Sequence, residues 1–243
     1  MLLRAHILDV ERATPRSLLL CVALDAPLEY EPGQAVLVGS ASSDARRPYS
    51  IATGPGRAAR DRRLELLVGL GEDGTPGSHL AVVDAGIPLI LEGPFGSFVC
   101  PPDIRDEAVL FVAGGTGIAP LRAMLQELLD EGTAAPRLKL LYSARAPEEF
   151  AFDAELRALA GEGRLRYHRT ATREAGPGWH GDRGRISRAQ LESLVDGPET
   201  LCFVCGPAAL VHEVPRMLRE IGVAPSWANG LGGKDRSGSR GCR

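Results

Sequence analysis

The spacing of apolar residues changes near residue 103 of the 243-residue chain, and this change constrains the fold more than any other feature. Before it, short apolar runs alternate with expected turns such as Pro32-Gly33, Gly54-Pro55-Gly56 and Gly93-Pro94, without a long helical period. This pattern predicts a small antiparallel β-barrel domain over residues 1–103. The expected strands cover residues 2–10, 16–24, 34–39, 47–53, 63–70 and 87–92.

Beyond residue 103, apolar strands alternate with amphipathic helical segments. Residues 109–115 (VLFVAGG) are apolar throughout, which is typical of a strand buried on both faces. The alternation predicts an α/β domain with a parallel sheet over residues 104–226. We expect strands at 137–143, 164–170 and 200–205, and helices after residue 117 and at 147–160, 187–195 and 207–221. Residues 227–243 are rich in glycine and arginine and are expected to form a disordered tail.

The composition excludes several functional classes. With 44% apolar residues and a net charge of −3, the chain has no overall field that would hold nucleic acid. No apolar run approaches the roughly 18 residues of a membrane span, and the N-terminus does not resemble a signal peptide. Five cysteines, an odd number, do not suggest a disulfide framework, so a cytoplasmic location is expected. The histidines lack metal-ligand spacing, and no metal is expected.

A glycine-rich turn, Gly114-Gly115-Thr116-Gly117, links the first parallel strand to its helix. Glycines allow a tight turn, and the amides and dipole of a helix N-terminus favour a pyrophosphate. Pro120 fits the first helical turn, at the position where the standard dinucleotide fingerprint has its third glycine. The alternative is a tight strand–helix turn without a ligand.

Arginines follow the next two expected strands. Ser143 and Arg145 end the segment LLYSAR, and Arg173 and Arg185 flank the following loop. Three guanidinium groups at one place would suit a phosphate dianion, such as the 2′-phosphate of NADPH. The alternative is that each is a solvated surface arginine.

In the first half, the segment RRPYSIAT (46–53) places Arg47, Pro48, Tyr49 and Ser50 at the start of a strand. Arginine can bind a phosphate through two hydrogen bonds, tyrosine can stack on an aromatic ring, and serine can reach a ring nitrogen. Taken alone, the segment could also be an ordinary strand with a half-exposed tyrosine.

Taken in order, the motifs RPYS, PGS, GPFG, GGTGIAP, YSAR and CGP closely resemble those of the ferredoxin–NADP reductase-like flavoenzyme family, over residues 1 to about 225. The resemblance implies an FAD-binding barrel followed by an NAD(P)H-binding domain. It further implies that Arg47 contacts the FAD pyrophosphate, with Pro48 beside it. Tyr49 would pack on the isoalloxazine ring, and Ser50 would face the flavin N5.

The same resemblance implies the remaining cofactor contacts. Gly77 and Ser78 resemble a second FAD phosphate turn, which follows the strand containing Val68. The expected contacts of the nicotinamide dinucleotide are Gly114, Gly115, Thr116, Gly117 and Pro120, with Cys205, Gly206 and Pro207 beside the nicotinamide ring. Arg145, Arg173 and Arg185, near Ser143, match 2′-phosphate positions, which favours NADPH over NADH. Ser50, Cys205 and Tyr49 are the predicted catalytic residues, and they would align the two rings.

The implied reaction is hydride transfer from NAD(P)H to FAD, followed by electron transfer to a redox protein such as ferredoxin, flavodoxin or an oxygenase. The cysteines lack the C-x4-C-x2-C spacing of a plant-type iron–sulfur domain, so we expect a separate acceptor. Trp227 is the candidate aromatic residue to cover the flavin. Two alternatives are an electron-transfer subunit of a larger redox complex and a nucleotide-binding interaction module without catalysis. The oligomeric state is left open.

Overall fold

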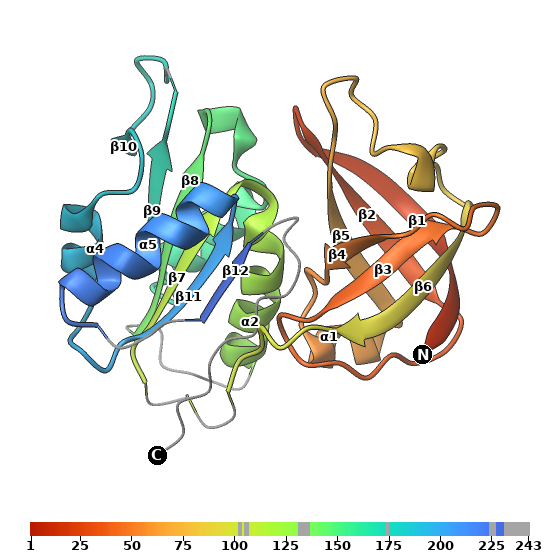
Figure 1. The fold of residues 1–243 in the computed structure, drawn as a ribbon, viewed down its shortest axis with the longest axis horizontal. Coiled ribbons are helices and arrows are strands. Elements are labelled where there is room, and N and C mark those ends of the chain that lie inside the picture. Colours follow the sequence, from red (N-terminus) through yellow and green to blue (C-terminus); the bar gives the residue numbers. More distant parts are fainter. Residues whose placement is uncertain (102–103, 105–106, 131–136, 174, 224–226, 231–243) are drawn as a thin grey trace.

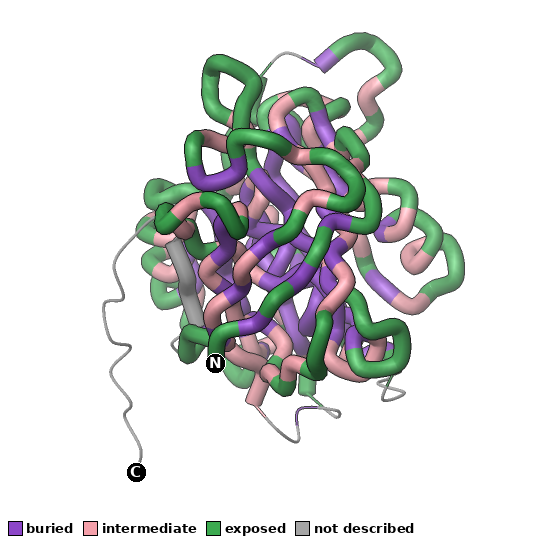
Figure 2. Tube along the Cα trace, turned by 90° about the vertical axis from the view of Figure 1, so that its right-hand side faces the viewer, coloured by how far each residue is buried: buried purple, intermediate pink, exposed green. Residues whose placement is uncertain are grey.

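Two β-sheets, one antiparallel and one parallel, organise the chain and lie side by side in the computed structural model (Figure 1). The structure describes residues 1–101, 104, 107–130, 137–173, 175–223 and 227–230. Buried residues concentrate along the strands inside the molecule, whereas the loops are exposed (Figure 2). Among the described residues, no helix has the length and apolar character needed to cross a membrane.

The first sheet is antiparallel throughout, with the strand order β4-β3-β6-β1-β2-β5. Alternate residues of β1, such as Leu3, Ala5 and Ile7, are buried, as expected for a sheet with one face on a core. Ile51, directly after β4, forms a β-bridge with Leu66 of β5, so the two edges of the sheet meet and close a barrel. Its elements are β1 (Leu2–Thr14), β2 (Ser17–Leu24), β3 (Ala35–Ser40), β4 (Arg47–Ser50), α1 (Pro55–Asp61), β5 (Arg63–Gly69), η1 (Ser78–Leu80) and β6 (Pro88–Phe95).

The second sheet is parallel, with the order β10-β9-β8-β7-β11-β12. The chain builds β7 to β10 in one direction and then returns to add β11 and β12 on the other side of β7, so the strand order reverses between β7 and β11. Its elements are β7 (Val109–Gly114), η2 (Gly115–Gly117), α2 (Ile118–Asp130), β8 (Leu138–Ala144), η4 (Pro147–Glu149), α3 (Asp153–Gly161), β9 (Arg166–Ala171), β10 (Asp182–Arg183), α4 (Arg188–Leu194), β11 (Leu201–Gly206), α5 (Ala208–Glu220) and β12 (Trp227–Gly230).

Helices cover both faces of the parallel sheet. Helices α2 and α3 pack on the face that includes Phe111, and α4 and α5 pack on the face that includes Leu110 and Val112. Helix α2 lies between this sheet and the barrel (Figure 1), and its core cluster includes Ala52 and Leu67 of the barrel half. The barrel therefore packs against the helix that begins at the glycine-rich turn.

The expected fold class, a barrel followed by a parallel α/β domain, is confirmed, and three local expectations need correction. The turn expected at Gly54 to Gly56 instead begins helix α1, where Pro55 occupies the first turn. The expected helix 147–160 is divided into η4 and α3, with Phe152 in a left-handed conformation between them. Residues 227–230, expected in a disordered tail, form β12 parallel to β11. The expected boundary at residue 103 and the tail beyond residue 230 lie outside the described residues.

Candidate functional site

One cluster of polar groups on the barrel joins the end strand β4 to the turn at η1. The hydroxyl of Tyr49 lies 2.6 Å from Nε2 of His79, and the two rings are stacked with centroids 5.7 Å apart. Burial raises the pKa of Tyr49 to about 12, so the phenol stays protonated near neutral pH. Burial, followed by the charge of Arg47, lowers the pKa of His79. Sequence reasoning missed His79, although it directly follows the PGS motif.

This cluster contains donors without acceptors. The buried Nδ1 atom of His79 has no hydrogen-bond partner among the described residues, and the exposed guanidinium group of Arg47 forms no ion pair or hydrogen bond with them. Gly77 has φ +98°, and a Cβ atom there would lie 3.5 Å from both Arg47 Nη1 and His79 Nδ1. When Tyr49 donates to Nε2, the neutral ring carries its hydrogen on Nδ1. A guanidinium group and a ring N–H beside a glycine backbone, with Ser78 next to them, fit the diphosphate of FAD.

The glycine-rich turn lies against the end of β11 in direct backbone contact. A Cβ atom on Gly117 would come within 2.3 Å of the carbonyl oxygen of Cys205, and one on Gly114 within 2.8 Å of Pro207 Cδ. Only glycine fits at such distances. Gly115, with φ +54°, has no atom within 4 Å of its Cβ position and therefore faces open space. In open parallel sheets, ligands bind at the carboxyl ends of the strands where the strand order reverses, which is the place this turn occupies.

Tyr142, a buried residue of β8, holds this turn by a hydrogen bond. Its hydroxyl donates to the carbonyl oxygen of Gly115 at 2.9 Å and accepts from the amide of Ala151 at 3.2 Å. Its ring meets Phe150 edge-on, with centroids 5.0 Å apart, and Phe150 in turn stacks on Trp179. One side chain thus fixes both the glycine-rich turn and the loop that follows Arg145.

A cavity of about 380 Å³ opens at this point between the two domains. The parallel-sheet domain contributes most of its wall, and the barrel contributes the turn between β1 and β2 and the end of β5. The predicted site residues that line it are Gly114, Gly115, Thr116, Ser143, Arg145, Arg185 and Pro207. Lining residues that sequence reasoning missed include Thr14, Arg16, Ser17, Tyr142, Glu149 and Glu213.

The three predicted arginines lie near one another, with different surroundings. The amide of Arg173 donates to the carbonyl oxygen of Arg145 at 2.8 Å, which joins the two loops, although Arg173 does not line the cavity. The exposed Arg185 lies 3.9 Å from Glu213 of α5. Arg145 is exposed and forms no ion pair with a described residue.

Other predicted residues lie away from the cavity. Pro48, Tyr49 and Ser50 are on β4, and Val68 is fully buried in the barrel core. Gly117, Pro120 and Gly206 are buried behind the turn, as is the thiol of Cys205. Burial raises the pKa of Cys205 to about 12, so the thiol stays neutral. Neither Tyr49 nor Cys205 lines the cavity. That these two residues align the flavin and nicotinamide rings therefore stays a prediction.

The two domains are joined beside the site by Arg122, which sequence reasoning also missed. This α2 residue donates to the carbonyl oxygen of Ala52, just beyond β4, at 2.8 Å, and it pairs with Glu65 of β5. Its Nε atom lies 2.7 Å from Glu155 of α3. Arg122 thus fixes the barrel strand that carries Tyr49 against the helix that begins at the glycine-rich turn. Among the described residues, no group of three or more potential ligand side chains is placed to hold a metal ion.

The chain is similar to known proteins over most of its length. Residues 111–215 match the family model described as the oxidoreductase NAD-binding domain. Over 204 residues, the chain is 35% identical to ferredoxin–NADP reductase B of Sorangium cellulosum, covering 80% of this chain and 81% of that one. This chain belongs to the ferredoxin–NADP reductase-like family. Members of this family are NAD(P)H-dependent flavin oxidoreductases that bind FAD and NAD(P).

Other members of the ferredoxin–NADP reductase-like family are longer. The glycine betaine monooxygenase reductase subunit of Chromohalobacter salexigens is 30% identical over 214 residues, which is 83% of this chain and 56% of that protein. The crystal structure of the Amycolatopsis cytochrome P450 reductase GcoB superposes with a TM-score of 0.81 at 26% identity, covering 93% of this chain and 68% of that chain. The chain thus spans a little over half of one curated relative and about two thirds of this structure.

Proposed function

We propose that this protein oxidises NADPH through bound FAD and passes the electrons to a redox protein outside these 243 residues. The observation that carries the proposal is the cavity at the reversal point of the parallel sheet, whose wall the barrel completes. When bound, FAD accepts a hydride from the nicotinamide and releases electrons one at a time. The part of the protein is to hold both cofactors and to exclude water between them.

For FAD, the proposed contacts are on the barrel. Arg47 and the Nδ1 atom of His79 would donate to the diphosphate, with the backbone of Gly77 and Ser78 against it. Tyr49 would pack on the isoalloxazine ring, and its hydroxyl is held by His79. Pro48, Ser50 and Val68 complete the proposed contacts on β4 and β5.

For the dinucleotide, the proposed contacts are at the edge of the parallel sheet. The turn from Gly114 to Gly117 would hold the diphosphate, with Pro120 in the first helical turn. Cys205, Gly206 and Pro207 would lie beside the nicotinamide. Ser143, Arg145, Arg173 and Arg185 would take the 2′-phosphate, and the unpaired state of Arg145 among the described residues supports NADPH over NADH.

The proposed acceptor is a one-electron redox protein. The names of the similar proteins mention ferredoxin, a monooxygenase and a cytochrome P450, which are acceptors of this kind. A subunit of a larger redox complex remains the second candidate, because relatives such as the Chromohalobacter reductase subunit are parts of larger enzymes. The cytoplasmic location stays a prediction from sequence.

The test is an anaerobic titration of the FAD-loaded protein with NADPH and NADH, followed by the flavin absorbance. We expect NADPH to bleach the flavin at lower concentration than NADH, and a one-electron dye to reoxidise it. A protein that takes up FAD without being bleached by either nucleotide would disprove the proposed reaction. A protein that takes up no FAD would support the non-catalytic module.

A further inference from the structure

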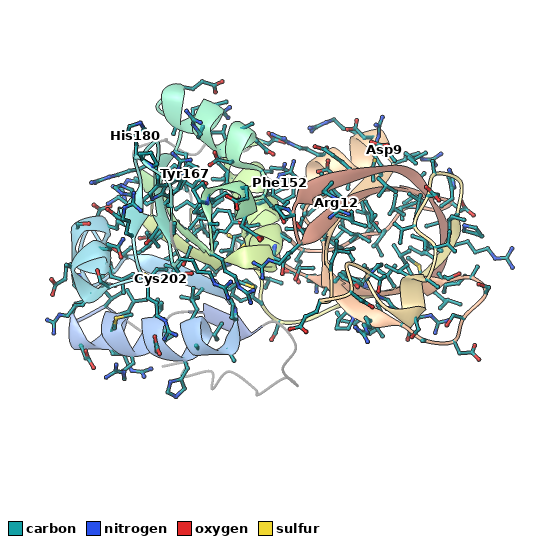
Figure 3. All side chains as sticks on the ribbon, turned by 90° about the horizontal axis from the view of Figure 1, so that it is seen from above. Asp9, Arg12, Phe152, Tyr167, His180 and Cys202 are labelled. Carbon is teal, nitrogen blue, oxygen red and sulfur yellow. The ribbon has the colours of Figure 1, made fainter. Side chains whose placement is uncertain are left out.

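The cavity contains a cation that comes from the barrel. Arg16, in the turn between β1 and β2, reaches across the domain boundary, and its Nε atom lies 2.6 Å from Glu149 Oε1 in η4. Both residues line the cavity. In Figure 3, the labelled Arg12 and Phe152 mark the two sides of the same boundary. Arg16 is the one charged residue that the barrel contributes to the described wall of the cavity.

The backbone of Arg16 is held in place from both sides. Its amide donates to the hydroxyl of Thr14 at 3.2 Å, and its carbonyl oxygen accepts from the amide of Leu70, after β5, at 2.9 Å. The hydroxyls of its neighbours Thr14 and Ser17 lie 2.7 Å apart and join the two ends of the turn. Because the backbone of Arg16 is already held, binding a ligand costs less conformational entropy here than it would on a free loop.

The guanidinium group of Arg16 has donors to spare. Only its Nε atom bonds to Glu149, and its two Nη nitrogens form no hydrogen bond with any described residue. A guanidinium group has five N–H donors in a planar fork that matches phosphate oxygens. Gly115, the open position of the glycine-rich turn, lines the same cavity.

We propose that Arg16 is a dinucleotide-binding residue, which holds the diphosphate of NAD(P)H against the glycine-rich turn from the barrel side. This inference rests on the proposed function, because it assigns a further contact to the same dinucleotide. The ligand is thereby held by both domains. Since the diphosphate is common to NADH and NADPH, Arg16 contributes to the binding of both.

Glu149 has a separate part in this arrangement. Its side chain is 14% exposed and places a negative charge in a cavity for an anionic ligand. Arg16 neutralises that charge and is oriented by it. Removal of Arg16 therefore has two effects, the loss of the phosphate contact and the exposure of the ligand to an unpaired carboxylate.

The experiment measures binding of NADP⁺ and NAD⁺ by calorimetry and the KM values for NADPH and NADH, for Arg16→Gln, Glu149→Gln and the double variant. We expect Arg16→Gln to weaken binding of both nucleotides about tenfold, with kcat changed less than about twofold. Glu149→Gln is expected to bind both at least as tightly as the parent chain, and the double variant to recover part of the loss. Arg4→Gln removes an equal charge from β1 outside the cavity, where no hydrogen bond of its side chain to the β1–β2 turn would be lost, and serves as the matched control.

Three results would overturn the proposal. Arg16→Gln could bind both nucleotides as the parent chain does, or lose affinity for NADPH and NADP⁺ alone, which would place Arg16 at the 2′-phosphate. Equal losses in Arg16→Gln, Glu149→Gln and the double variant would show a domain clamp without a ligand contact. Because calorimetry reads binding without turnover, failure of the proposed reaction would be seen separately, as a flavin that the nucleotides do not bleach.

Discussion

The barrel cluster and the cavity at the parallel sheet both contain cationic groups, but the two sites differ in how those groups are satisfied. On the barrel, Arg47 and Nδ1 of His79 have no partner among the described residues. In the cavity, Arg16 is paired with Glu149 and Arg185 with Glu213, whereas the exposed Arg145 has no ion pair among the described residues. The buried Nδ1 donor of His79 without an acceptor costs about 1–3 kcal/mol, which a ligand can relieve, whereas the carboxylates beside Arg16 and Arg185 place negative charge next to an anionic ligand. The difference suits a resident cofactor on the barrel and an exchanging one in the cavity.

The largest expected effect comes from removing the unpaired arginine of the barrel. Arg47→Ala should weaken FAD binding by about 100-fold, because a charge-assisted contact to the diphosphate is lost without a substitute. Flavin fluorescence during titration of the apoprotein measures this affinity. Arg4→Ala removes another exposed arginine, from β1, and should leave the affinity unchanged. An Arg47 variant that keeps FAD as tightly would contradict the proposed barrel site.

A smaller effect is expected beneath the cavity. Tyr142→Phe removes the hydroxyl that holds the carbonyl of Gly115 and should raise KM for NADPH and NADH about tenfold, while FAD affinity is retained. Tyr167→Phe, on the adjacent strand β9, loses a hydrogen bond to Asp153 instead and is the matched control. Equal KM increases in the two variants would point to general destabilisation of the sheet.

Releasing a paired arginine should give a change of the opposite sign. Glu213→Gln frees Arg185 from its carboxylate and removes a negative charge from the cavity wall. We expect KM for NADPH to fall about two- to threefold, with a smaller change for NADH, since the pair is exposed and its interaction is weak. Glu220→Gln breaks an ion pair on the same helix outside the cavity and should leave both values unchanged. A larger decrease for NADH than for NADPH would contradict a 2′-phosphate role for Arg185.

The smallest expected effect is a pH dependence of the apoprotein. Because burial lowers the pKa of His79 in the folded state, the unfolded chain binds its proton more readily. The contribution of neutral His79 to the free energy of unfolding is therefore complete above the ordinary pKa of about 6.5, and it is lost as the pH falls below that value. Urea unfolding between about pH 5 and 8 should show this decrease, and His79→Gln should show a flatter profile. His168, whose pKa burial also lowers, is present in both proteins and gives a common background. Parallel profiles for the two proteins would contradict the buried neutral state of His79.

Local chemistry accounts for what the sequence could predict. The apolar run 109–115, the glycine-rich turn and the order of short motifs indicated the two sheets and the family, because each depends on neighbouring residues. Gly117 was identified as a turn glycine, and the structure adds the reason that no side chain fits beside the carbonyl of Cys205.

The rest depends on residues that meet only in the folded chain. Arg16 and Glu149 are 133 positions apart, and nothing around either residue distinguishes it from the other charged residues of the chain. The helix at Pro55 was missed because its two glycines and proline resemble a turn, whereas packing on α2 favours a helix. The strand at Trp227 could not be predicted because its sequence is glycine-rich and it forms by pairing with the edge of β11, which is distant in the sequence.

The buried Arg122 has a consequence for any attempt to dissect the protein. A fragment consisting of the parallel-sheet half alone would keep the guanidinium group and Glu155, but it would lose the carbonyl of Ala52 and the carboxylate of Glu65. The apolar face of α2 that now covers Ala52 and Leu67 would be open to water at the same time. Each half thus stabilises the other. Expressed separately, each should be less stable and more prone to self-association than in the intact chain.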